Sequence, residues 1–276
     1  MSNQKYKILV LSDMKNTVDT ILKSTISLSQ IIDADIEFLH VMKPTDIVDT
    51  ESQLSAMRTI NNEHLVMDKK IKKLLEPLHK DYNVKINFSI SCGHIKSEIS
   101  DCIKSCKPDI IVLGKKKSSA LSFIGDNVTD FIFKNHEGAV LIAAGNNLSP
   151  NSELSLGILN DSNENINLEY VDSLLTNTKK PLQSFTFIDR SKNSKLDSII
   201  SKKNTVEYVF DQGDNTVKNL CKYLTKSNVN LLFLNRAKNA SNKKLLALSS
   251  KQKAVINNVN VSLLFSNTVN PIGIVK

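Results

Sequence analysis

The chain has 276 residues, of which 41% are hydrophobic and 23% are charged, and its formal net charge is +8 at pH 7. With 8 Gly and 6 Pro, this composition excludes collagen-like and Pro/Gly-rich disordered chains and is typical of globular domains. No apolar run approaches the ~20 residues that cross a bilayer, and the polar start of the chain does not resemble a signal peptide, so we expect a cytoplasmic protein without a membrane partner.

The positive charge does not by itself favour a nucleic-acid partner. All but three of the basic residues are Lys, no long basic run occurs, and aromatic residues make up only 5% of the chain. Nucleic-acid-binding surfaces usually combine clustered basic residues with a recognisable motif. We therefore expect a solvated, Lys-rich surface and no nucleic acid.

The four cysteines are Cys92, Cys102, Cys106 and Cys221. Cys102 and Cys106 stand one helical turn apart, with His94 nearby, but a structural zinc site needs four convergent ligands. We predict no metal site and small, buried, free thiols.

In the first half of the chain, short apolar runs alternate with segments whose apolar residues recur at helical spacing. The expected strands lie at 8–11, 36–41, 84–91, 109–113 and 139–142, and the expected helices at 18–25, 50–80, 95–106 and 128–132. Strands that alternate with helices predict a parallel sheet with helices on both faces.

A turn-rich junction at 146–155 separates this pattern from a second, similar one. Its expected strands lie at 154–159, 182–188, 206–210 and 231–234, with a helix around 220–224. As many residues separate Asn235 from Val261 as separate Gly114 from Val140, which indicates an internal duplication. We predict two tandem domains, 1–146 and 153–268, each with a five-stranded parallel sheet flanked by helices.

The pattern resembles the universal stress protein family in its tandem two-domain form. The resemblance rests on the first strand with Asp13, the second strand ending at Val41, Gly93, the run from Asp109 to Gly114, and residues 139–142. It implies an α/β fold of two Rossmann-like (adenine nucleotide alpha hydrolase-like) domains. It also implies that these domains pair within the chain through their fifth strands as a pseudo-dimer, in a stress-response module. A homodimer and a protein partner are left open by the sequence.

Many members of that family bind ATP, and others do not. In those that do, the acid after strand one lies by the adenosine, the end of strand two meets the adenine, and a Gly-x-x-Gly-x9-Gly-Ser/Thr stretch holds the phosphates. The resemblance thus places an adenosine at Ser12, Asp13 and Val41, and the phosphates of ATP, with Mg²⁺, from Gly114 onward. Independently, open α/β sheets bind ligands beyond the carboxyl ends of their strands, and a glycine before a helix N-terminus favours phosphate.

The phosphate stretch departs from the family pattern after its first glycine. Lys117 replaces the second glycine, Asn127 replaces the third with Gly125 two residues early, and Val128 replaces the hydroxyl residue with Thr129 beside it. Two interpretations stay open: the Lys117 side chain fills the phosphate space, or Lys115 to Lys117 pair with the phosphates by charge. In the second copy, the segment after Asn235 has no glycine and Asp161 stands alone, so we expect no ATP there.

The sequence contains neither the Gly-x4-Gly-Lys-Ser/Thr phosphate loop nor the Gly-x-Ser-x-Gly nucleophile motif. His40 falls inside an expected strand and is interpreted as a core histidine rather than a base. We therefore expect a non-enzymatic module that binds ATP in its first half. Two alternatives stay open: an interaction scaffold that binds no nucleotide, and a slow ATP hydrolase.

Overall fold

The computed structural model describes residues 5–15, 17–44, 52–115, 128–145, 148–160, 168–188, 205–213, 215–236 and 248–267. The elements of the first half are β1 (Tyr6–Leu11), α1 (Val18–Ile32), β2 (Ala34–Met42), α2 (Gln53–Tyr82), β3 (Ile86–Cys92), α3 (Ile95–Cys106), β4 (Ile110–Gly114), α4 (Val128–Asn135) and β5 (Ala139–Ala143). Those of the second half are β6 (Leu156–Asn160), α5 (Leu168–Asn177), β7 (Leu182–Ile188), β8 (Thr205–Asp211), α6 (Thr216–Lys226), β9 (Leu231–Arg236), α7 (Ser250–Asn258) and β10 (Ser262–Asn267). None of these helices is long and apolar enough to cross a membrane.

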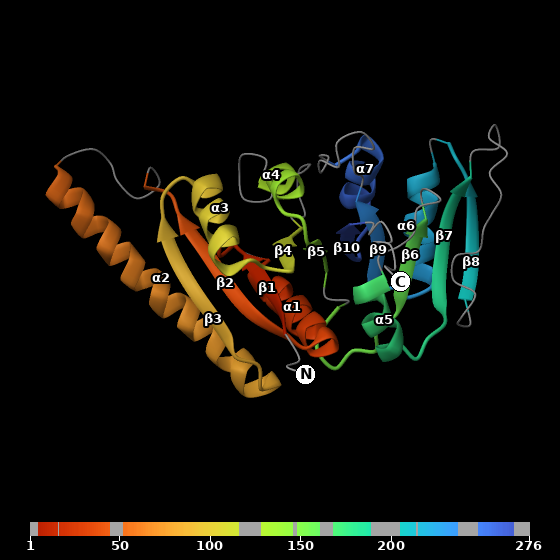
Figure 1. Ribbon diagram of the computed structural model, residues 1–276, viewed down its shortest axis with the longest axis horizontal. Coiled ribbons are helices and arrows are strands. Elements are labelled where there is room, and N and C mark those ends of the chain that lie inside the picture. Colours follow the sequence, from red (N-terminus) through yellow and green to blue (C-terminus); the bar gives the residue numbers. More distant parts are fainter. Residues whose placement is uncertain are drawn as a thin grey trace, which may run out of the picture.

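The strands form one ten-stranded sheet in the order β3-β2-β1-β4-β5-β10-β9-β6-β7-β8 (Figure 1). All pairs within each half are parallel, and the strand order reverses between β1 and β4 in the first half and between β6 and β9 in the second. This confirms the predicted α/β class with a Rossmann-like, mostly parallel sheet.

Alternate residues of each strand enter two apolar cores on opposite faces of the sheet. In β4, Ile110 and Val112 face the core under α1, α2 and α5, whereas Ile111 and Leu113 face the core under α3, α4, α6 and α7. Since both faces are covered by helices, the central strands are apolar without interruption, as parallel strands of this kind require.

The long helix α2 packs on the sheet only through its second half. Ile71, Leu75 and Leu78 are its buried apolar residues, and Leu54 and Met57 near its start are exposed. In Figure 1 the beginning of α2 extends past the edge of the sheet at β3.

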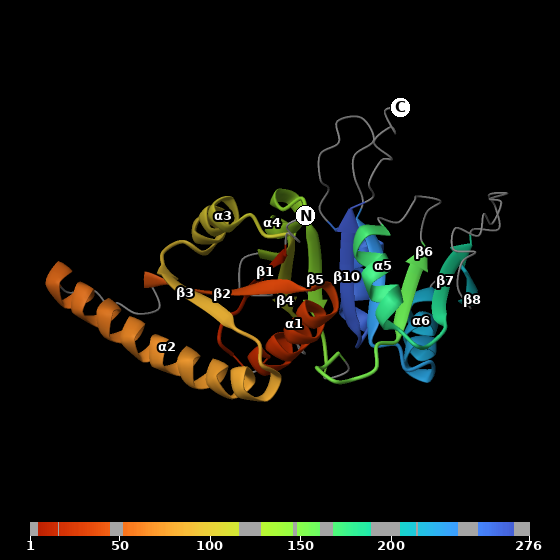
Figure 2. The same cartoon turned by 60° about the horizontal axis from the view of Figure 1, so that its bottom comes forward.

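The two halves meet at a seam where β5 pairs with β10 in antiparallel orientation, with Leu141 opposite Leu264. On one face of the seam α1 lies beside α5 (Figures 1 and 2). On the other face, Lys253 of α7 lies 3.2 Å from a carboxylate oxygen of Asp130 of α4. The seam is therefore held by backbone pairing, by helix packing and by an ion pair.

One pair of polar residues makes equivalent contacts in the two halves. Asp109 precedes β4, accepts the Lys7 amide on Oδ2 at 2.8 Å, and donates its own amide to Lys7 O at 2.9 Å. Asn230 precedes β9 and does the same with Ser155, at 2.9 and 3.1 Å. Both side chains thereby fix the start of the first strand of their half against the fourth strand.

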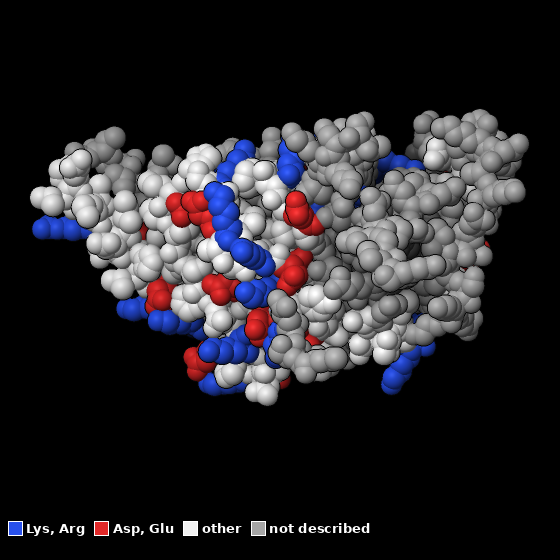
Figure 3. Space-filling view, in the orientation of Figure 1, with Lys and Arg blue, Asp and Glu red and all other residues white. Residues whose placement is uncertain are grey.

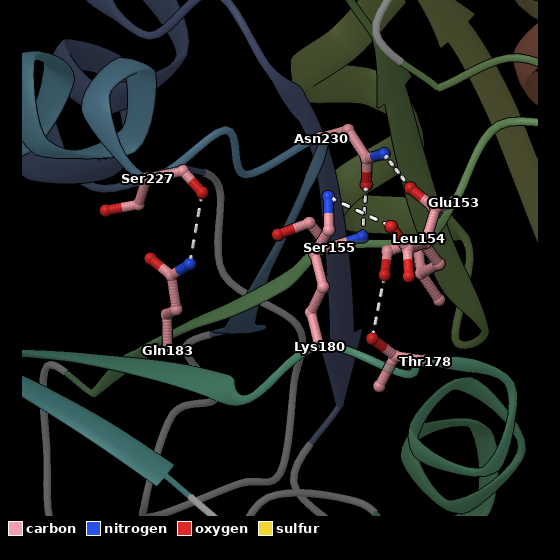
Figure 4. A network of polar contacts seen from close by, with 8 residues as sticks. All are labelled: Glu153, Leu154, Ser155, Thr178, Lys180, Gln183, Ser227 and Asn230. Atoms are coloured by element: carbon pink, nitrogen blue, oxygen red, sulfur yellow. Dashed lines mark hydrogen bonds and ion pairs between the residues drawn. The ribbon is translucent and has the colours of Figure 1, made fainter.

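In the second half this contact belongs to a larger polar network at the start of β6 (Figure 4). Asn230 Nδ2 also donates to Glu153 O at 2.8 Å, and Thr178 Oγ1 donates to Leu154 O at 2.7 Å. Because the network lies at the amino end of the parallel strands, on the edge opposite to the candidate ligand site, we assign it a structural role.

The register of β5 and β10 corrects the sequence analysis, which matched Val261 of the second half with Val140 of the first. Ile111 pairs with Val140, and its equivalent Leu232 pairs with Leu263. Leu263, not Val261, is therefore the counterpart of Val140. The equal spacing in the sequence was misleading because the segment between β9 and β10 is longer than that between β4 and β5.

Candidate functional site

The candidate site lies at the carboxyl ends of β1, β2 and β4, where the strand order of the first half reverses. β1 lies between β2 and β4, so the loop after β1 is flanked by the ends of both neighbours. The structure brings Ser12, Asp13, Val41 and Gly114 to this edge of the sheet. Ligands of open α/β sheets bind at such an edge.

The loop after β1 is fixed by its own side chains. Ser12 Oγ accepts the Met14 amide at 3.1 Å, and Asp13 Oδ1 accepts the Lys15 amide at 3.1 Å. Met14 adopts a positive φ of 56°, which this local bonding supports. Asp13 is a partly exposed residue at the end of β1, held there through Oδ1, and its other carboxylate oxygen, Oδ2, is buried.

His40 is buried beside this loop, and its ring is hydrogen-bonded to the loop backbone. Its Nδ1 lies 2.9 Å from Ser12 O, and because a carbonyl only accepts, Nδ1 carries the proton. Burial lowers the pKa of His40, so the ring is neutral near pH 7. This confirms the interpretation of His40 as a core histidine.

Val41 is only partly buried at the end of β2, where it pairs with Ser91 of β3. The chain continues past β3 into Gly93, whose amide donates to Met42 O at 3.0 Å. An apolar side chain is thus left partly accessible next to the loop that carries Asp13.

Gly114 at the end of β4 is required by the packing of α1. A Cβ at this position would collide with Cδ1 of Ile21, would lie 2.8 Å from its Cγ1, and would lie 3.1 Å from Thr17 Oγ1. The sequence suggested that this glycine serves a phosphate, but its immediate role in the structure is the close approach of β4 and α1.

Lys115, the next residue, reaches away from its own half. Its Nζ donates to Val259 O at 2.6 Å and to Asn257 O at 3.3 Å, at the end of α7 across the seam. Of the three lysines expected to pair with phosphates, the structure thus commits Lys115 to backbone carbonyls. Lys117, Gly125 and Asn127 lie outside the described residues.

Thr129 lies in the first turn of α4, which follows the phosphate stretch. Its side chain is buried, and its hydroxyl has no hydrogen-bond partner among the residues that the structure describes. The next residue, Asp130, is engaged by Lys253. Thr129 therefore places a buried hydroxyl near the N-terminus of α4, whose amides also favour an anion.

The equivalent edge of the second half is occupied by a buried arginine. Arg236 follows Asn235 as Lys115 follows Gly114, and the residue is 2% exposed. It donates to carbonyls at the end of α4 and lies 5.1 Å from the centroid of the Phe133 ring. Burial lowers the pKa of Arg236 to about 10, so it is charged at pH 7. Asp161 lies outside the described part of the chain.

Sequence reasoning placed His136 in the loop before the fifth strand, but it assigned no role to His136 or Arg236. His136 is buried after α4, with Nε2 3.2 Å from Ala139 O and its carbonyl bonded to Arg236. Burial, followed by the charge of Arg236, lowers the pKa of His136 to about 4. No local pattern could have shown this, because the two residues belong to different halves and meet only when the sheet is continuous.

The cysteines show no metal-binding arrangement in the described ranges, which contain no group of three or more metal-ligating side chains. The Sγ atoms of Cys102 and Cys106 lie 3.9 Å apart. Burial raises the pKa of Cys102 to about 12, so this thiol stays protonated.

On the face seen in Figure 3, oppositely charged side chains alternate over the first half. Among the described residues, the ion pairs Lys23–Asp19 and Lys80–Glu76 each join neighbouring turns of a helix. Charges paired in this way form a solvated surface.

Neither a protein-family model nor a curated protein matches this chain. Solved structures do match. A universal stress protein from Archaeoglobus fulgidus DSM 4304 superposes with a TM-score of 0.68 at 14% identity, over 96% of this chain and 100% of that chain. A universal stress protein from Pseudomonas aeruginosa UCBPP-PA14 superposes with a TM-score of 0.58 at 9% identity, over 95% of this chain and 93% of that chain. A protein of unknown function from Pseudomonas aeruginosa PAO1 superposes with a TM-score of 0.59 at 8% identity, over 96% of this chain and 93% of that chain. At these identities the likeness establishes that this chain has the fold of the universal stress protein structures along nearly its whole length.

Proposed function

We propose that the protein is a stress-response module of the universal stress protein type that binds ATP in its first half. The observation that carries the proposal is the position of Asp13. It stands at the strand-order reversal, between the partly exposed Val41 of β2 and the end of β4 at Gly114. The full-length match to universal stress protein structures supports the same conclusion at the level of fold.

The described residues fit an adenine nucleotide by their chemistry. The Asp13 carboxylate suits the hydroxyls of a ribose, and Val41 offers an apolar surface to a base. The α4 N-terminus and the Thr129 hydroxyl, which has no partner among the described residues, suit phosphate oxygens. Mg²⁺ enters the proposal only as the ion that accompanies the nucleotide phosphates.

The proposal is binding without catalysis. His40 interacts electrostatically with Asp13, but it is neutral and donates Nδ1–H to Ser12 O. A general base must be within reach of the proton that it removes, and His40 is only 6% exposed beside the loop after β1. We therefore assign the site a sensing role, in which the bound nucleotide changes the protein rather than being consumed.

Isothermal titration with Mg·ATP tests the site. Asp13→Asn keeps an oxygen for the Lys15 amide and removes the charge, so the loop stays folded while the ribose loses a charge-assisted hydrogen bond. Such a bond is worth roughly 1.5–3 kcal/mol, so we expect about ten- to hundredfold weaker binding. The matched control is Asp101→Asn on the exposed face of α3, which should bind as the unmodified protein does. If the unmodified protein shows no heat of binding and no thermal stabilisation with Mg·ATP, ATP is removed from the proposal.

A scaffold that binds no nucleotide is the second candidate, and two contacts favour it. The Lys115 ammonium is used by carbonyls of α7, and Ile21 fills the space beside Gly114. On this alternative, ATP leaves the melting temperature of the protein and of Asp13→Asn equally unchanged.

A further inference from the structure

Lys115 and Arg236 cross the seam in opposite directions from equivalent positions. β1 pairs with Ile110 of β4 as β6 pairs with Leu231 of β9. Lys115 follows Ile110 at the same distance in sequence as Arg236 follows Leu231. Each half therefore sends one cation, from the end of its fourth strand, into the other half.

Both cations reach the C-terminal end of a helix. Lys115 Nζ lies 2.6 Å from O of Val259, the residue that caps α7. Arg236 Nη1 lies 2.8 Å from O of His136, which follows α4 directly. The last carbonyls of a helix have no partner within it and carry the negative end of its dipole, so a cation stabilises both helix ends.

The two contacts differ in how firmly they are held. Arg236 is 2% exposed and makes further bonds, to Phe133 O at 2.6 Å and to Gly138 O at 2.5 Å. Lys115 is half-buried and donates only to carbonyls, and no carboxylate among the described residues forms an ion pair with it. Burial lowers the pKa of Lys115, which indicates an ammonium that is poorly compensated for its lost hydration.

We propose, on the basis of the proposed function, that Lys115 is a releasable contact through which nucleotide binding loosens α7. Without nucleotide, its ammonium holds the carbonyls at the end of α7. When the phosphates of a nucleotide bind after Gly114, the ammonium moves to them, and the end of α7 loses its cation. Arg236 does not move, so the two halves stay joined while one helix end in the second half becomes more mobile.

The exchange of partners has a physical basis. A phosphate oxygen carries a full charge and is a stronger partner for an ammonium than a neutral carbonyl. A nucleotide shifts a conformational equilibrium by its difference in affinity for the two states, and a single transferable lysine supplies such a difference. A lysine suits this role because its ammonium turns freely, whereas the planar guanidinium of Arg236 is fixed by several carbonyls at once.

Amide hydrogen exchange of the full chain, followed in the peptide covering residues 254–262, tests the proposal. Without nucleotide, Lys115→Met should exchange about tenfold faster there than the unmodified protein, because a charge-assisted bond to the helix end is lost. Saturating Mg·ATP should raise the exchange of the unmodified protein to a similar rate and should leave Lys115→Met unchanged. Lys104→Met, which alters an exposed lysine of α3, should behave as the unmodified protein in both conditions.

Lys115→Arg provides a variant that keeps the contact. It should protect the end of α7 as well as lysine does, and ATP should raise its exchange less. If ATP binds by calorimetry but the exchange of 254–262 in the unmodified protein does not rise, the release is wrong while the proposed site stands. If, without nucleotide, Lys115→Met exchanges at the same rate as the unmodified protein, the Lys115 contact does not stabilise the end of α7 and the proposal is wrong. If no ATP binds, both the site and the coupling fall.

Discussion

His136 is a buried residue whose protonation is set by a charge from the other half. Its pKa is lowered to about 4, first by burial and then by the neighbouring guanidinium of Arg236. The unfolded chain binds the proton near pH 6.5, and the folded chain does not until about pH 4. Folding therefore excludes a proton from this ring over that interval.

We predict that stability falls as the pH decreases from about 6.5 to 4 because of His136. Above pH 6.5 the ring is neutral in both states and contributes no pH dependence. Below pH 6.5, only the unfolded state takes up the proton, so the free energy of unfolding falls by up to about 1.4 kcal/mol per pH unit. Urea unfolding of the protein and of His136→Gln at several pH values measures this. An equal pH slope in both proteins would contradict the assignment.

At the scale of the elements, the approach of α1 to β4 is set by Gly114. The side of α1 that faces the sheet is apolar. Its other sides can be buried because their small hydroxyl residues bond to the helix backbone: Thr25 Oγ1 donates to Ile21 O at 2.7 Å, and Ser29 Oγ donates to Ile26 O at 2.9 Å. Ser24 Oγ donates instead to Leu148 O at 3.0 Å. α1 therefore has little room to move away from β4.

Gly114→Ala is predicted to destabilise the fold by about 1–3 kcal/mol, since overpacking of a tight interior typically costs this much. The added methyl would meet Ile21. The control is Gly213→Ala, because a Cβ there would meet no atom within 4 Å. Denaturant midpoints of the two variants decide the point, and equal stability would show that α1 relaxes at little cost.

At the scale of the whole molecule, the antiparallel pairing of β5 with β10 makes one sheet of two parallel halves. Apolar residues from both strands enter the same two cores, and the Phe133 ring meets the Phe265 ring edge-on with 5.1 Å between centroids. Arg236 adds a fixed polar link across this seam. The halves are therefore coupled in stability and not only in position.

Arg236→Met is predicted to lower the free energy of unfolding by about 3 kcal/mol, because the buried carbonyls of Phe133, His136 and Gly138 lose their donor. Arg236→Lys should lose less, since it keeps the charge with fewer donors in place. Arg58→Met, at an exposed position of α2, is the matched control. An Arg236→Met protein as stable as this control would refute the link.

The sequence by itself determined the fold class and the elements of the first half, whereas the helices α5 and α7 of the second half were not predicted. Runs such as residues 110–113 are apolar on both faces of a strand, as a strand covered by helices on both sides requires. The period of the apolar residues and the order of the segments were therefore sufficient to predict the fold class. Asp13, Val41 and Gly114 could be placed at one edge because parallel strands end together. Thr129 could be named but not assigned a contact, since its surroundings come from other elements.

Only the tertiary structure decided what Gly114, Lys115 and Arg236 do. In the sequence, Gly114 and Lys115 look like parts of a phosphate loop, yet one is fixed by Ile21 and the other reaches α7 in the other half. The register of β10 was likewise hidden, because Leu263 rather than Val261 faces the fourth strand at the equivalent point. Local sequence patterns show at which spacing residues are buried in a helix or strand. Contacts between residues far apart in the chain depend on how the two halves are brought together.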